Sequence, residues 1–198
     1  MDAFEQVVSE ILLFEGYWVR TSVKVELTPR DKRAIGRPNA PRWELDIVAY
    51  NVRDNLLRVV ECKGYLYSRG VTFASLDGTS EGSAKRFKLF VDSHLRKVVF
   101  GRLCKQFTKS GACRPKPRVK LCLACGHIAT DHDREKLKNH FTKRGWELLD
   151  ERWLKGKLYE MAENCYENKV PIVVTKLVED QEVGNFCGKK KMTLSSRS

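Results

Sequence analysis

The chain has 198 residues, 42% of them hydrophobic and 31% charged, which suits one folded domain and excludes an intrinsically disordered protein. Its formal net charge of +12 favours a polyanionic partner, and its apolar runs are shorter than the roughly 18 residues of a membrane helix, so we expect no membrane contact. Seven cysteines, an odd number at wide spacing, argue against a secreted disulfide framework; since no secretion signal is visible, we expect a cytoplasmic protein.

The first predicted element is a helix that ends near Gly16. Its apolar residues recur at helical spacing: Phe4, Val7, Val8, Ile11, Leu12 and Phe14. Tyr17 then opens an extended segment. We therefore expect an N-terminal helix that leads into a sheet.

Two short apolar runs, 42–50 and 56–63, are separated by a polar break and predict a β-hairpin. Pairing Asp46 with Glu61 leaves Arg53-Asp54 as a two-residue turn. Because side chains alternate along a strand, Asp46, Glu61 and Lys63 would share one face. The opposite face would carry four apolar side chains, those of Leu45, Ile47, Val60 and Cys62.

The shared face predicts a metal site. Two carboxylates opposed on paired strands repel each other. Lys63 relieves part of this repulsion, and a divalent cation between Asp46 and Glu61 would relieve far more. The alternative is the solvated side of a half-buried sheet. The apolar residues that flank these positions on both strands are typical of a sheet covered on both faces, which favours the metal site.

The next stretch, Tyr65 to Gly82, contains glycine, serine and aspartate, and we expect a loop over the active face. Four of its side chains are candidates to touch a sugar or base: Tyr65, Tyr67, Arg69 and Phe73. A helical pattern with interleaved lysines and arginines follows from Ser83 and carries Gln106. We interpret this basic surface as part solvated helix and part phosphate-binding stripe.

Residues 119–125 predict a buried strand that contains Cys122 and Cys125. A Cys-x-x-Cys pair raises the alternative of structural zinc. Residues three apart on a strand face opposite ways, however, and free cysteine packs well in cores. Core packing is therefore the favoured interpretation of the two cysteines.

The last third continues as α/β. We predict a helix from Asp131 that ends at Gly145, an extended piece at 146–149, a helix from Asp150 and a final strand at 171–178. No linker separates a second domain, so we expect one domain over residues 1–178. A basic, mobile tail would occupy 179–198.

An Asp on one strand followed by Glu-x-Lys on the next resembles the restriction-endonuclease-like PD-(D/E)xK nuclease superfamily. The resemblance implies an α/β fold with a mixed central sheet flanked by helices. It also implies that Asp46, Glu61 and the backbone carbonyl of Cys62 hold Mg²⁺, for which Mn²⁺ would substitute, and that Lys63 orients the attacking water. Leu45 stands where the superfamily usually has proline.

The N-terminal pattern, Phe4-Glu5, a helix and then Gly16-Tyr17, resembles archaeal-type Holliday-junction resolvases and Mrr-like nucleases. The resemblance implies that Glu5, with Glu10 in reserve, reaches into the metal site. It implies as well that Gln106 lies near the metal-bound phosphate and that the chain could act as a homodimer.

These observations together predict a Mg²⁺-dependent DNA endonuclease that cleaves either duplex sites or branched DNA. Two alternatives stay open. One is a DNA-binding module with a nuclease-like fold and no cleavage activity, and the other is an interaction protein stabilised by zinc.

Overall fold

The computed structural model describes residues 2–39, 42–78, 85–164 and 169–186. The chain forms two compact units, Met1–Leu154 and Lys155–Ser198. The predicted domain of residues 1–178 therefore spans the first unit and part of the second. No helix in the described ranges is long and apolar enough to cross a membrane.

The first unit is built on a five-stranded sheet in the order β1-β2-β3-β4-β5. Its strands are β1 (Trp18–Val25), β2 (Trp43–Asn51), β3 (Leu56–Lys63), β4 (Arg118–Cys125) and β5 (Glu147–Leu149). The first three strands pair antiparallel, whereas β3 with β4 and β4 with β5 pair parallel. The prediction of an α/β fold with a mixed central sheet and flanking helices is confirmed.

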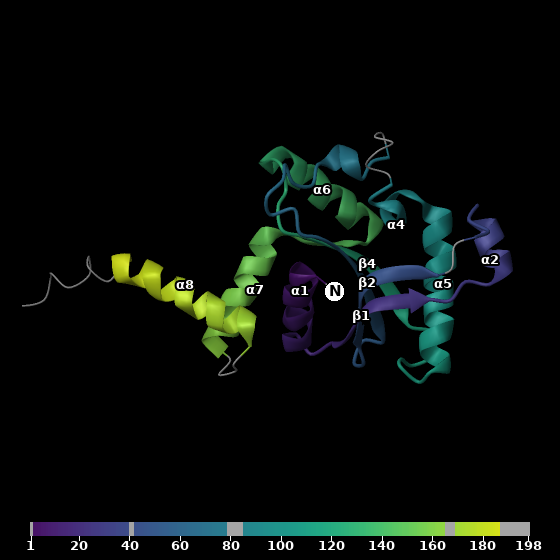
Figure 1. Cartoon of the computed structure of the whole chain (residues 1–198), viewed down its shortest axis with the longest axis horizontal. Helices are drawn as coiled ribbons and strands as arrows, with labels where there is room; N and C mark the ends of the chain where they lie inside the picture. Colours follow the sequence, from purple (N-terminus) through teal and green to yellow (C-terminus); the bar gives the residue numbers. More distant parts are fainter. Residues whose placement is uncertain (1, 40–41, 79–84, 165–168, 187–198) are drawn as a thin grey trace, which may run out of the picture. The chain divides into compact units, whose positions relative to one another are not determined.

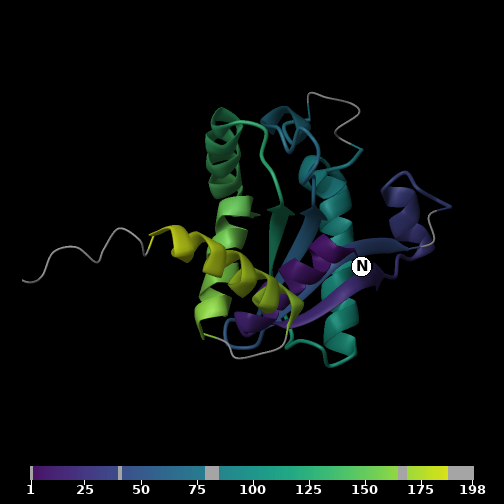
Figure 2. The same ribbon diagram turned by 60° about the vertical axis from the view of Figure 1, so that its left-hand side comes forward.

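Helices cover both faces of this sheet. Those of the first unit are α1 (Ala3–Phe14), α2 (Pro29–Ala34), the 3-10 turn η1 (Phe73–Ser75), α4 (Lys88–Val91), α5 (Ser93–Lys109) and α6 (Asp131–Arg144), and α7 (Glu151–Asn164) crosses the unit boundary. Figures 1 and 2 show α1 and α5 on opposite faces of the sheet. A sheet covered twice buries its central strands on both sides, which explains their nearly continuous apolar sequences.

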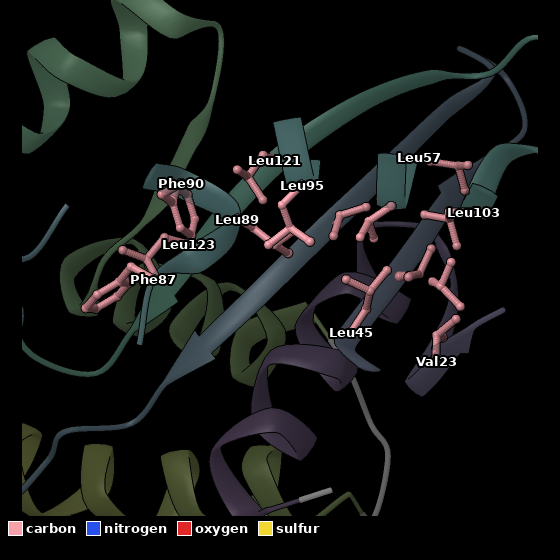
Figure 3. Packing of buried hydrophobic residues seen from close by; sticks show 14 of the residues in the cluster. Val23, Leu45, Leu57, Phe87, Leu89, Phe90, Leu95, Leu103, Leu121 and Leu123 are labelled. Carbon is pink, nitrogen blue, oxygen red and sulfur yellow. The ribbon is translucent and has the colours of Figure 1, made fainter. Parts of the chain in front are cut away.

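The larger core lies between the sheet and α5 (Figure 3). Helix α5 contributes an apolar stripe at helical spacing, made of Leu95, Val99, Leu103 and Phe107. The sheet contributes Val48, Leu57, Val59, Leu121 and Leu123, all at most 1% exposed. This packing fixes the sheet, and with it the strands that carry the predicted site.

The N-terminal helix leads into the sheet as predicted. Asp2 and Glu5 form a capping box, in which each side chain accepts a hydrogen bond from the other's backbone N–H. Val8, Ile11 and Leu12 are fully buried. The capping box thus sets where α1 begins, and its apolar face holds the helix in place.

In the last third, α6 and its stop at Gly145 agree with prediction; Gly145 is left-handed with φ +67°. The predicted strand at 171–178 is wrong, because these residues belong to α8 (Val170–Phe186). Pro171 stands in the first turn of that helix, where its missing N–H costs nothing, and this start signal outweighs the branched side chains that suggested a strand. The predicted tail begins inside α8, and residues 187–198 lie outside the described part of the chain.

Candidate active site

The register of the β2–β3 hairpin brings the two predicted metal ligands together. Pairs run from Asn51 with Leu56 to Ile47 with Val60, and Asp46 and Glu61 are the next residues of the two strands beyond the last pair. The register is as predicted. The turn differs, because Val52 to Asn55 form four turn residues instead of two.

The pairing of β1 with β2 is interrupted at Ser22 and Asp46. Across the β1–β2 ladder, Ser22 stands opposite Asp46, has φ +50° and is missing from the otherwise continuous pairing. Close to this interruption, Leu45 lies in the same core cluster as Val48, although residues three apart on a regular strand face opposite ways. The prediction that Leu45 shares a face with Ile47 is wrong for this reason. The interruption thus falls at Asp46, one of the two predicted metal ligands.

Hydrogen bonds orient both carboxylates. The backbone N–H of Cys62 donates to Asp46 Oδ2 at 2.8 Å, which ties the first carboxylate to the strand that carries the second. Lys63 Nζ lies 2.7 Å from Glu61 Oε1, and these two side chains are only 20% and 19% exposed. An ion pair shielded from water in this way is stronger than one on the open surface.

The pKa values of Glu61 and Lys63 are both shifted by burial and by the charges around them. Burial raises the pKa of Glu61, Lys63 opposes that effect and Asp46 adds to it, so the carboxyl titrates above its ordinary value. Burial lowers the pKa of Lys63, but the attraction of Glu61 outweighs burial and the pKa is raised. Lys63 is therefore a firmly held ammonium at neutral pH.

A pocket of about 200 Å³ opens over the two carboxylates. It is lined by Trp43, Glu44, Asp46, Glu61, Lys85, Arg86, Lys88 and Leu89. Three cationic side chains thus line the same pocket as the carboxylates of Glu44, Asp46 and Glu61. The sequence showed these cations only as members of a basic stripe; their place beside the carboxylates depends on how the chain folds back before α5.

Glu5 lies close enough to Asp46 for the charge of Asp46 to raise the pKa of the Glu5 carboxyl. Burial raises the pKa of the Glu5 carboxyl, the hydrogen bond from the backbone of Asp2 lowers it, and the charge of Asp46 raises it, with a net increase. The same carboxylate closes the capping box of α1. Glu5 therefore combines a structural bond with a position beside the predicted site.

Gln106 has a different set of partners. Its Nε2 donates to the carbonyl of Lys24 at 3.0 Å, and its Oε1 accepts from the N–H of Glu26 at 3.1 Å. The side-chain amide therefore pairs with the outer edge of the sheet at the end of β1, as a neighbouring strand would. No sequence signal indicated this pairing.

The described cysteines support core packing. Cys122 and Cys125 are fully buried on β4, and both are free thiols. Burial raises the pKa of the Cys62 thiol, as does the nearby charge of Asp46. Over the described residues, no group of three or more His, Cys, Asp and Glu side chains is arranged to hold a metal ion.

The donor set nevertheless fits one class of cation. Mg²⁺ is commonly held by only one or two carboxylates and completes its shell with water and phosphate oxygens. Asp46 and Glu61 supply two such carboxylates at one pocket, and the Cys62 N–H bond fixes the direction of the first. Soft metals that prefer thiolate ligands would find none here, because the Cys62 thiol is buried and protonated.

No protein-family model, curated protein sequence or solved structure matches this chain.

Proposed function

We propose that the chain is a divalent-cation-dependent DNA endonuclease with a restriction-endonuclease-like core. The observation that carries this proposal is a pocket lined by carboxylates, among them Asp46 and Glu61, and by three cations, Lys85, Arg86 and Lys88, which we call the basic ring. An acidic pair alone binds cations, and a basic ring alone binds anions. Their combination suits a phosphodiester that reaches the carboxylates through a shared cation.

Each residue has a separate task. Asp46 and Glu61 would hold Mg²⁺ or Mn²⁺, with the carbonyl of Cys62 as a further oxygen donor. When bound, the cation would supply Lewis-acid activation of the phosphodiester and of the attacking water. The basic ring would hold phosphates on either side of the cleaved bond.

Lys63 contributes its positive charge. Its Nζ lies 2.7 Å from Glu61 Oε1, which places an ammonium beside the acidic pair. From its place beside Glu61 it donates hydrogen bonds, orients the attacking water and offsets the negative charge that develops on the phosphate.

The test is cleavage of labelled supercoiled, linear, single-stranded and four-way-junction DNA, with and without Mg²⁺. Asp46→Asn is the informative variant, because the amide oxygen can still accept from Cys62 N–H while the charge is lost. We expect Asp46→Asn and Lys63→Met each to lower the cleavage rate at least 100-fold, within the range of a lost transition-state contact.

Matched controls come from the far end of the hairpin and from β4. Asp54→Asn removes an exposed carboxylate at the turn, and Lys120→Met removes a strand lysine. Both variants should cut at the wild-type rate. Cleavage at the wild-type rate by Asp46→Asn would refute the assignment of the catalytic site to this pocket, and DNA binding without cleavage by the unsubstituted protein would favour the binding-module alternative.

A further inference from the structure

The segment directly after β3, residues 64–70, forms a tip whose two ends are held by hydrogen bonds. At the first end, Gly126 N–H donates to the carbonyl of Lys63 at 3.1 Å. At the second, Val71 N–H donates to the carbonyl of His127 at 3.0 Å, and Ala129 N–H donates back to Val71 at 3.0 Å. The 64–70 tip is therefore attached to the end of β4 on both sides.

The backbone of the tip has a fixed bend. Tyr65 has φ +45°, a conformation that costs a non-glycine residue on the order of 1 kcal/mol. Gly70 has φ +84°, and a Cβ there would lie 2.7 Å from the His127 ring and 2.9 Å from its carbonyl oxygen. Such close packing holds the tip in one shape.

This shape presents apolar side chains to water. Leu66 is 63% exposed and Tyr67 is 103% exposed, the largest exposure among the exposed large hydrophobic residues. Isolated exposed apolar residues are common, but adjacent ones on a constrained loop indicate an interaction site. The tyrosine ring has both faces available.

The tip is close to the proposed catalytic residues and carries no negative charge. Tyr67 is four residues from Lys63, so the two backbones are at most about 14 Å apart. No aspartate or glutamate occurs between Lys63 and Leu76, and the exposed Arg69 adds a positive charge. The tip itself therefore adds no repulsion to an approaching polyanion.

We propose that Tyr67, supported by Leu66, stacks on a nucleobase of the DNA near the cleaved phosphate. This inference rests on the proposed nuclease function and narrows its substrate. A ring fixed on a short tip stacks at the lowest cost on a base that has already left the helix stack, so the preferred substrate contains an unpaired or readily unstacked base. Aromatic stacking of this kind is worth about 5- to 150-fold in affinity per base.

The experiment compares two duplexes of the same sequence, one fully paired and one with a single unpaired base. Affinity is measured by fluorescence anisotropy in EDTA, so that no strand is cut. We expect the unsubstituted protein to prefer the unpaired-base DNA at least 5-fold, Tyr67→Phe to keep that preference, and Tyr67→Ser to reduce it to near 1.

Trp18→Ser is the matched control. Trp18 is also an exposed aromatic, at 65%, but it pairs with Tyr50 beside the hairpin turn, at the other end of the sheet from Glu61. Its loss should leave the preference unchanged. Because the Tyr67 side chain contacts mainly solvent, Tyr67→Phe and Tyr67→Ser should both melt at the wild-type temperature.

The outcomes separate this inference from the proposed function. Equal affinity for the two duplexes, or an unchanged preference in Tyr67→Ser, would overturn the stacking proposal while cleavage of paired DNA would still support the nuclease. Absence of binding to either duplex would overturn the stacking proposal, whereas the nuclease proposal would still be decided by the cleavage assay with Mg²⁺.

Discussion

Gly126 is the position where adding one methyl group should disturb the fold most directly. A Cβ on this residue would lie 2.2 Å from the carbonyl oxygen of Gly64 and 2.8 Å from Leu66 Cδ2. The leucine can move aside, since it is largely exposed. The carbonyl cannot, because the neighbouring Lys63 carbonyl accepts the hydrogen bond from Gly126 itself.

The expected cost of Gly126→Ala follows from that distance. Ordinary contacts of a Cβ begin at 3.4 Å, so the oxygen and the methyl group must separate by 1.2 Å (3.4 minus 2.2). Overpacking of this kind costs about 1–3 kcal/mol. For a chain of this size, the melting temperature should fall by about 2–12 °C.

Gly101→Ala is the matched control. Gly101 lies in the middle of α5, and a Cβ there meets nothing within 4 Å. Alanine in an exposed helix interior should stabilise by about 1 kcal/mol and raise the melting temperature by about 2–4 °C. Circular dichroism melts of both variants measure the two opposite shifts. A Gly126→Ala protein that melts at or above the wild-type temperature would refute the close approach of the β3 and β4 ends.

Three further variants test separate features. Arg134→Met should cost about 3–5 kcal/mol in urea unfolding because it leaves the buried carboxylate of Asp150 unpaired, whereas Arg152→Met, which removes an exposed ion pair, should change stability by less than about 1 kcal/mol. Burial and nearby cations lower the pKa of His140 in the folded protein. As pH falls below 6.5, the imidazole of the unfolded chain therefore binds a proton first, and the free energy of unfolding drops. His140→Phe should flatten this change between pH 7.5 and 5.5, and an unaltered slope would contradict the reasoning. Gln106→Met should lower stability by about 1 kcal/mol and leave the cleavage rate intact, and loss of cleavage in a folded Gln106→Met protein would instead return this residue to the catalytic site.

The hairpin could be predicted because its pairing is local. A short polar break fixes which residues of β2 and β3 face each other, and the apolar pattern permits only one register, so Asp46 and Glu61 follow from the sequence. The irregularity at Ser22 could not be predicted in the same way. It depends on a positive φ in a residue that carries no glycine-like signal.

The remaining parts of the site depend on tertiary structure. Lys85 and Lys88 line the same pocket as Asp46 and Glu61, although they are more than twenty residues away from either carboxylate in the sequence. The hydrogen-bond partners of Gln106 are about eighty positions away in the sequence, and no local pattern around Gln106 predicts them. Local patterns specify elements and their faces, whereas the meeting of distant loops is set by the packed core.

The order of strands also bears on how the chain folds. The β2–β3 hairpin closes across the four turn residues from Val52 to Asn55, whereas the parallel pairing of β3 with β4 must close across residues 64–117. The longer closure costs about 2 kcal/mol more in chain entropy, so we expect the hairpin to form first. The two carboxylates then face each other before α5 covers the sheet. The electrostatic repulsion between these carboxylates therefore acts on the strands that pair first, and the branched apolar residues of the two strands must stabilise the hairpin against it.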